Sequence, residues 1–369
     1  MFGSRNFLFA KSAVALGNLF AWGFNGAGQI GDGTTANSSS PIMVGTLSTW
    51  SKPAGGKAVF SAAILCTKTD GSLWSWGNGY SGQLGLGNTP SYSSPKQIGT
   101  LTNWSTPSIG NGNSACIKTD GTLWSWGNNG NGQLGLGNTT YYSSPKQVGA
   151  LTTWSKLSAG QASMVCTRTD GTLWSWGNGA QGRLGLGNTT SYSSPKQIGA
   201  LTSWSTPSAG SGFVLCTKTD GTLWSWGYNG NGFLGLGNTT DYSSPKQVGS
   251  LTNWATPATS INASFCVKTN GTLFAWGRGF SGALGVGNTY NYSSPKQVGA
   301  LTNWSIPTAG LNATGCTKTD GTFWTWGRNN EGQLGQGNTI DTSSPVQVGA
   351  LTNWLNPALG SVTFVCTTT

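Results

Sequence analysis

Residues 116–165 read CIKTDGTLWSWGNNGNGQLGLGNTTYYSSPKQVGALTTWSKLSAGQASMV, and this stretch recurs along the whole chain with few changes. A Trp-Gly pair appears seven times, at Trp22, Trp76, Trp126, Trp176, Trp226, Trp276 and Trp326. The first interval is 54 residues and the others are 50, and the four extra residues lie between Pro53 and Cys66. Cysteines keep the 50-residue spacing, at Cys66, Cys116, Cys166, Cys216, Cys266, Cys316 and Cys366. The chain is therefore an array of seven copies of one unit.

Each unit reads as short strands joined by tight turns. In CIKTDGTLWSWG, two runs of β-branched and aromatic residues flank Asp120-Gly121, a dipeptide that predicts a type I′ hairpin turn. No window shows a helical period with capping residues. Because an all-β repeat of this length is typical of a propeller blade, we predict a seven-bladed β-propeller with four-stranded antiparallel blades.

The run WGNNGNGQLGLG (residues 126–137) and the later SSPKQVG (residues 143–149) strongly resemble the repeat of the regulator of chromosome condensation family. That repeat has a Trp-Gly followed by a GQLG core and a later P-x-x-V. The resemblance covers nearly the whole chain, and it implies a seven-bladed propeller. The family pattern also has a His before the strand that leads into the Asp-Gly turn, whereas this chain has no His.

The two ends suggest how the ring closes. Residues 361–369 (SVTFVCTTT) repeat the first strand of the unit better than the N-terminal KSAVALGN does. We therefore expect the strand around Cys366 to pair with the strand leading to Trp22. Residues 1–16 would then form an arm or partial strand outside a propeller of residues 17–369, so that truncation at Leu16 leaves the propeller folded. The arm is also a candidate contact for a homo-oligomer; a frayed terminus is the alternative.

Composition excludes several classes of protein. Only 8% of the 369 residues are charged, against roughly a quarter in ordinary domains, but 36% are apolar, so the chain can form a core. The absence of His removes the commonest general base and metal ligand. Equivalent sites on different blades lie too far apart for disulfides, and no Cys has a second ligand nearby. We expect seven buried free thiols, no metal and no cofactor.

The N-terminal sequence MFGSRNFLFAKSAVALG is a poor secretory signal, because Lys11 interrupts its apolar stretch. No run of 18 apolar residues exists, so we expect no membrane insertion. Free thiols and a missing signal fit assembly in a reducing cytoplasm.

The formal charge of +10 is spread by the repeat. One set of basic residues precedes the Asp-Gly turn: Lys68, Lys118, Arg168, Lys218, Lys268 and Lys318. A second set lies within SSPKQ: Lys96, Lys146, Lys196, Lys246 and Lys296. A cationic ring could attract phosphate or acidic sugar. We favour a solvated rim that keeps the protein soluble, and nucleic-acid binding is disfavoured because no basic run or known module is present.

Three motifs are better explained by structure than by chemistry. The run Gly130–Gly135 satisfies G-x-G-x-x-G, but no helix follows it as a dinucleotide site requires. The turn carboxylates occur once per blade, which does not bring together the pair that a glycosidase needs. The regular Trp residues favour packing between blades over sugar stacking.

Function is more readily sought where the repeats differ from one another. The loop after Trp-Gly and the triplet before SSP vary most, and Tyr, Asn, Ser and Gly form adaptable recognition surfaces. The candidate binding residues are Tyr80, Tyr141, Arg278, Phe280, Tyr290, Arg328, Asn329, Asn330, Glu331 and Asp341. Those of the sixth and seventh units lie near the closing seam, where a capping role competes with binding.

Three functions remain open. We favour a non-catalytic binding or structural propeller, such as a bacteriophage virion or tail-fibre component or an adhesin, that contacts host glycan or neighbouring virion proteins. Its location would be a virion or extracellular particle assembled in the host cytoplasm. The alternatives are a cytoplasmic regulator of the guanine-nucleotide-exchange or chromatin type, as the resemblance implies, and a polysaccharide-acting enzyme, for which no pair of titratable groups stands out.

Overall fold

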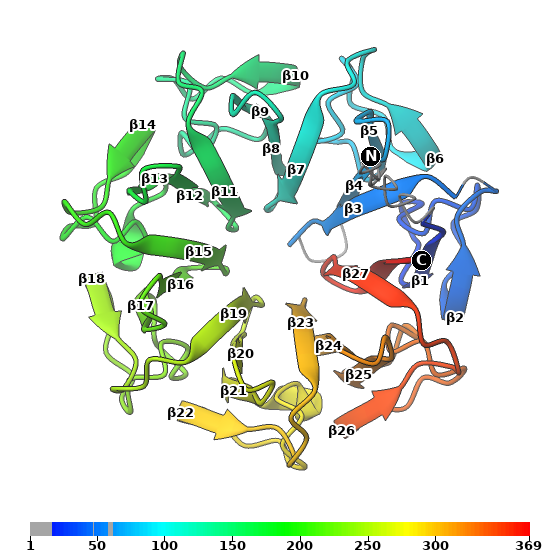
Figure 1. The fold of residues 1–369 in the computed structure, drawn as a ribbon. Helices are drawn as coiled ribbons and strands as arrows, with labels where there is room; N and C mark the ends of the chain where they lie inside the picture. The colour runs from blue at the N-terminus through cyan, green and yellow to red at the C-terminus, as the bar shows by residue number, and fades with distance from the viewer. Residues whose placement is uncertain (1–16, 47, 58–61) are drawn as a thin grey trace, which may run out of the picture.

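The computed structural model describes residues 17–46, 48–57 and 62–369. They form a ring of seven four-stranded antiparallel sheets around a central axis, as predicted (Figure 1). In each blade the first strand of the meander lies nearest the axis and the fourth lies at the rim.

Blade 1 combines both ends of the described chain and consists of β27 (Trp354–Leu359), β28 (Thr363–Thr368), β1 (Leu19–Gly23) and β2 (Ser38–Met43). Blade 2 consists of β3 (Trp50–Gly55), β4 (Ala63–Lys68), β5 (Leu73–Gly77) and β6 (Tyr92–Gln97). Blade 3 consists of β7 (Trp104–Ile109), β8 (Asn113–Lys118), β9 (Leu123–Gly127) and β10 (Tyr142–Gln147). Blade 4 consists of β11 (Trp154–Ala159), β12 (Ser163–Arg168), β13 (Leu173–Gly177) and β14 (Tyr192–Gln197).

Blade 5 consists of β15 (Trp204–Ala209), β16 (Phe213–Lys218), β17 (Leu223–Gly227) and β18 (Tyr242–Gln247). Blade 6 consists of β19 (Trp254–Thr259), β20 (Ala263–Lys268), β21 (Leu273–Gly277) and β22 (Tyr292–Gln297). Blade 7 consists of β23 (Trp304–Ala309), β24 (Ala313–Lys318), β25 (Phe323–Gly327) and β26 (Thr342–Gln347). Two single 3-10 turns, η1 (Ala180–Gly182) and η2 (Phe280–Gly282), are the helical elements of the described residues, and no helix among them is long and apolar enough to cross a membrane.

The hairpin between the second and third strands differs from the predicted type I′ turn. In blade 3 the Gly121 amide donates to the Lys118 carbonyl (3.0 Å), and the Lys118 amide donates to the Thr122 carbonyl (2.9 Å). Gly121 has φ +77°, whereas Asp120 is not among the residues of positive φ. The loop is therefore a three-residue type I turn closed by a left-handed glycine, and the type I′ prediction was wrong. Asp120 Oδ1 instead accepts hydrogen bonds from the amide and hydroxyl of Thr122.

The GQLG segment of each blade locks onto the next blade. The Trp126 indole is fully buried, and its Nε1 donates to the Gln83 carbonyl of blade 2 (2.9 Å). The Gly87 amide of the same segment donates to the Ser143 carbonyl on β10 (2.8 Å). Every Trp of the Trp-Gly set repeats this inter-blade bond. Packing between blades thus explains these tryptophans, as predicted, and no helix follows the G-x-G-x-x-G run.

The ring closes through β28, as predicted from the C-terminal repeat. Strand β28 pairs with β1 over five residues, with Cys366 opposite Phe20 and Phe364 opposite Trp22. The Trp22 and Phe364 rings stack at 5.4 Å. Trp22 Nε1 donates to the Gln333 carbonyl of blade 7 (3.1 Å), so the closing seam uses the same contact as the other six. The expected arm, residues 1–16, lies outside the described residues.

The four-residue insertion falls in the connection between β3 and β4, where residues 58–61 also lie outside the described part. The Lys57 amide at its start donates to the Gly110 carbonyl of blade 3 (2.9 Å). The Lys57 ammonium donates to the Ala209 carbonyl of blade 5, three blades round the ring, and burial lowers its pKa to about 8. The start of the insertion thus contacts blades 3 and 5 on the inner side of the ring.

All seven cysteines are free and buried, which confirms the prediction. Each occupies the middle of a second strand, and burial raises every thiol pKa, that of Cys116 to about 12. These thiols fill the core and are poor nucleophiles.

Candidate functional site

The meander gives the ring two chemically different faces. Connections between first and second strands and between third and fourth strands emerge on one side, which we call the loop face; its variable parts are residues 78–91 of blade 2 and their equivalents. The Asp-Gly turns and the links between successive blades emerge on the opposite side, the turn face. All ten candidate binding residues lie in third-to-fourth strand connections, so the topology places them on the loop face.

Two kinds of loop follow the Trp-Gly pair. In blade 3, Asn129 is buried, its amide nitrogen donates to the Asn138 and Thr140 carbonyls, and its carbonyl oxygen accepts from the Leu134 amide. In blade 2 the same position is Gly79, where a Cβ would lie 2.1 Å from the Pro90 carbonyl oxygen. The residue before the fourth strand also holds the loop, because Ser91 Oγ accepts a hydrogen bond from the Gly79 amide. Part of the sequence variation between repeats therefore reflects two ways of holding the loop together, and not differences in what the loop could bind.

Two candidate residues serve this architecture. Asn329 is fully buried, and its side chain bonds the Asn338 and Ile340 carbonyls and the Leu334 amide. Asp341 is exposed, but its Oδ1 accepts from the Asn329 amide (2.7 Å). A binding role for Asn329 is thus corrected to a structural one, because burial leaves no surface for a partner, and Asp341 holds the same loop from outside.

Three polar candidates near the seam bond to one another and to blade 1. Glu331 Oε2 accepts from Asn37 Nδ2 across the closing interface (2.7 Å), and Glu331 Oε1 accepts from Asn330 Nδ2 (3.2 Å). Arg328 Nε donates to Asn330 Oδ1 (2.7 Å). These contacts therefore support the capping role, which was the alternative to binding for these residues.

The four aromatic candidates are all exposed. Tyr80 is 78% exposed, Tyr290 70%, Tyr141 53% and Phe280 49%. Tyr80 and Tyr141 lie on neighbouring blades 2 and 3, whereas Phe280 and Tyr290 share one loop of blade 6, where the Arg278 guanidinium lies 5.1 Å from the Phe280 ring centroid. The exposed aromatic candidates thus lie on blades 2 and 3 and on blade 6 of the loop face, with blades 4 and 5 between them.

Sequence reasoning missed one exposed residue of the loop face. Ile340 of blade 7 is 69% exposed, more than any other large aliphatic side chain among the described residues. It occupies the position that Tyr290 occupies one blade earlier. Aligning the repeats by position would have found it, since both residues directly follow the G-N-T run.

The two cationic sets have different environments. Lysines of the rim set are exposed, and their Nζ atoms lie 5.2–5.7 Å from tyrosine ring centroids of the same strands. In the turn-face set, Lys68 is only 7% exposed, with Nζ 3.8 Å from the Trp74 centroid and 4.7 Å from that of Trp50. The expected solvated rim is therefore wrong for the turn-face set, whose cationic groups lie over aromatic ring faces.

The turn carboxylates are each held within their own turn. Asp70 and its equivalents each bond the residue two positions on, and these hydrogen bonds hold the pKa of each carboxyl below its ordinary value. Within residues 17–46, 48–57 and 62–369, no group of three or more His, Cys, Asp or Glu could hold a metal ion.

These features define the class of protein: a closed seven-bladed β-propeller, rigid between its blades, that presents variable loops on one face. The chain belongs to the family described as the regulator of chromosome condensation (RCC1) repeat, whose pattern matches residues 17–59, 70–117, 120–166, 170–217, 220–264, 270–309 and 320–362.

Individual relatives are distant. Human E3 ubiquitin-protein ligase HERC2 is 31% identical over 93 residues, which is 25% of this chain and only 2% of HERC2. The crystal structure of human WBSCR16 superposes with a TM-score of 0.85 at 20% identity, covering 95% of this chain and 98% of that one. Prp20p from Saccharomyces cerevisiae gives 0.82 at 19% identity, covering 96% and 92%. The two structures share the fold.

Proposed function

We propose that this protein is a non-catalytic binding propeller that engages a macromolecular partner through the loop face. The observation that carries the proposal is the exposure of Tyr80, Tyr141, Phe280 and Tyr290 in loops of an otherwise repetitive scaffold. Aromatic side chains give large contact area at low entropic cost, and binding residues are commonly found on loops held by a rigid frame. The five turn carboxylates accept hydrogen bonds within their own turns, which supports binding rather than catalysis.

The favoured partner is a host glycan or a neighbouring virion protein, with the chain as a virion or tail-fibre component assembled in the host cytoplasm. Support comes from the low charged fraction, the near-identical repeats and the Tyr- and Asn-rich loops. Seven buried thiols fit assembly in a reducing compartment. Mass spectrometry of purified particles tests this setting, and absence of the protein from every particle would count against it.

Membership of the RCC1-repeat family favours a second candidate, a cytoplasmic regulator that binds proteins. The structure of Prp20p was described together with its binding properties to Gsp1p and histones. An assay of nucleotide release from small GTPases separates the candidates: acceleration by this protein would favour the regulator.

The loop-face proposal is tested by variants and a matched control. Tyr80→Ser and Tyr290→Ser remove exposed rings, whereas Leu355→Ser changes a side chain that is 40% exposed near the turn-face end of β27. On a glycan array and in pull-down from purified particles, we expect the tyrosine variants to bind at least about tenfold more weakly, and the Leu355 variant to bind like the parent. Equal binding by all three variants would refute the proposal.

A further inference from the structure

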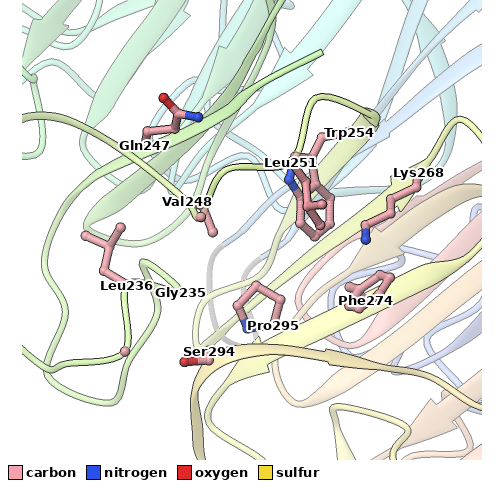
Figure 2. A pocket seen from close by; sticks show the side chains of 12 residues that line it. Gly235, Leu236, Gln247, Val248, Leu251, Trp254, Lys268, Phe274, Ser294 and Pro295 are labelled. Atoms are coloured by element: carbon pink, nitrogen blue, oxygen red, sulfur yellow. The ribbon is translucent and has the colours of Figure 1, made fainter.

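A pocket of one design recurs between blades on the turn-face side. Five such pockets, of about 370 to 420 Å³, lie between consecutive blades from 1 to 6. Each is lined by the link entering a first strand, by the aromatic side chain of that blade's third strand and by the proline of its fourth strand. Figure 2 shows the pocket between blades 5 and 6, where Lys268 extends over Phe274 beside Trp254.

The ammonium group of Lys268 has unused hydrogen-bonding capacity. Its Nζ lies 4.1 Å from the Phe274 centroid and 4.7 Å from the Trp254 centroid. In the part of the chain that the structure describes, this Nζ donates no hydrogen bond and forms no ion pair. Ring faces attract the charge but do not satisfy three N–H donors. Desolvation by burial, the first cause, lowers the pKa of Lys268, as it does for the equivalent lysines of blades 2, 3, 5 and 7.

The pocket between blades 5 and 6 differs from its equivalents in charge. In blades 2, 3, 5 and 7 an aspartate two residues after the lysine interacts with it, as Asp220 does with Lys218. Blade 6 has Asn270 at this position, so Lys268 lacks that partner. No carboxylate lines the pocket, and the exposed Lys246 and Lys296 directly adjoin its lining residues Gln247 and Pro295. The electrostatic potential here therefore favours an anion.

The residues that line this pocket restrict the kind of molecule that can carry the anionic group. Leu236, Val248, Leu251 and Pro295 give an aliphatic lining, and Leu251 is 47% exposed. A sugar would need an open aromatic face, but Trp254 is only 4% exposed and already faces the ammonium. A phosphate is better served by several donors or a guanidinium fork than by one ammonium. A single carboxylate between aliphatic groups fits both the charge and the lining.

We propose that the pocket between blades 5 and 6 binds an acidic side chain from an extended segment of a partner protein. The carboxylate accepts hydrogen bonds from Lys268 Nζ, and flanking aliphatic side chains lie against Leu251 and Pro295. This site is on the opposite side of the ring from the loop-face aromatics, so it stands whether or not the proposed function is correct.

The experiment uses the full chain and two capped peptides, Gly-Leu-Glu-Leu-Gly and its glutamine counterpart. Binding is followed by NMR chemical shifts and calorimetry. We expect the glutamate peptide to bind at a stoichiometry of one, and the glutamine peptide at least about tenfold more weakly. Equal binding of the two peptides, or no binding of either at the highest soluble concentration, would overturn the proposal.

Three variants assign the site. Lys268→Gln should weaken binding of the glutamate peptide at least about tenfold, whereas Lys218→Gln, the matched change one blade away, should leave it unchanged. Asn270→Asp keeps the lysine but adds the missing carboxylate, so it should weaken binding as well. Melting temperatures show whether each variant is folded. Equal effects of Lys268→Gln and Lys218→Gln, or unchanged affinity in Asn270→Asp, would place the peptide elsewhere.

Discussion

At the scale of the residue, the blades are joined by contacts that tolerate almost no added atom. A Cβ at Gly85 would lie 2.7 Å from Trp126 Nε1, the indole nitrogen that bonds the Gln83 carbonyl. Gly85 also has φ +72°, which side chains rarely adopt. The glycine of GQLG is thus required twice, by its backbone angle and by the tryptophan of the next blade.

A pair of glycine variants separates these two requirements. Gly99 has φ +59° and nothing within 4 Å of an added Cβ, so Gly99→Ala suffers only the left-handed backbone cost, about 1–2 kcal/mol. Gly85→Ala suffers the same cost and also displaces the buried indole. We expect Gly85→Ala to lower the free energy of unfolding clearly more than Gly99→Ala, measured by denaturant titration. Equal losses would mean that the inter-blade contact adds nothing.

The buried thiols give a pH-dependent prediction. Burial raises each thiol pKa above its unfolded value, so the native state keeps protons that the unfolded chain releases. The stabilisation is complete below the ordinary thiol pKa of about 8.5 and is lost as the pH rises toward the folded value, about 12 for Cys116.

Titration with dithiobis(nitrobenzoate) near that ordinary pKa should therefore label no cysteine in the native protein and seven after unfolding. The melting temperature should fall with further rise in pH, and the fall should be shallower in Cys116→Ala. Rapid labelling of the native protein would contradict the assigned burial.

At the scale of the element, each blade has two edge strands, and proline occurs in both except in blade 4, whose first strand has Leu157 at this position. Thirteen of the 14 prolines lie in first or fourth strands, as Pro107 does in β7 and Pro145 in β10. Proline lacks an amide proton, so an edge that carries it cannot be extended readily by another strand. The rim lysines follow the fourth-strand prolines of blades 2 to 6 and add charge to those outer edges.

Replacing rim prolines should promote self-association. In the triple variant Pro145→Val, Pro195→Val and Pro245→Val, three neighbouring outer edges regain a free amide and a β-branched side chain. We expect a larger apparent mass with rising concentration, measured by sedimentation and light scattering. The control is Ser144→Val, Ser194→Val and Ser244→Val, which adds apolar surface to the same strands but keeps the prolines. Equal association of both proteins would assign the effect to hydrophobicity alone.

The strands were predictable from the sequence because one pattern is repeated seven times, whereas the loops were not. The type I turn at Asp120 has the same dipeptide as a type I′ turn, and only the three-residue spacing between paired strands distinguishes them. The repeat position of Asn329 varies between blades as a recognition position would. Yet it is occupied only by asparagine, which bonds the carbonyls of its own loop, or by glycine, which leaves room for a carbonyl of that loop. The pocket at Lys268 combines residues from two blades, and one repeat alone does not reveal it.

At the scale of the whole molecule, the ring depends on a seam formed by residues from opposite ends of the chain. Blade 1 contains no covalent link between β28 and β1, so their pairing and the stacking of Trp22 on Phe364 hold the two ends together. The other six blades are continuous meanders. Opening of the ring should therefore begin at blade 1, although its contacts resemble those of every other blade.

Truncation tests this dependence. A chain ending at Gly360 lacks β28, which leaves β1 and β27 with unpaired edges and exposes Trp22, a fully buried side chain. We expect a melting temperature lower by many degrees, or oligomers in which the unpaired edges join between molecules. A synthetic peptide of residues 361–369 should restore the parent melting temperature in part. A chain beginning at residue 17 is the matched control, because it keeps all 28 strands, and it should melt like the parent. A monomeric chain ending at Gly360 with unchanged melting temperature would show that the seam does not hold the ring.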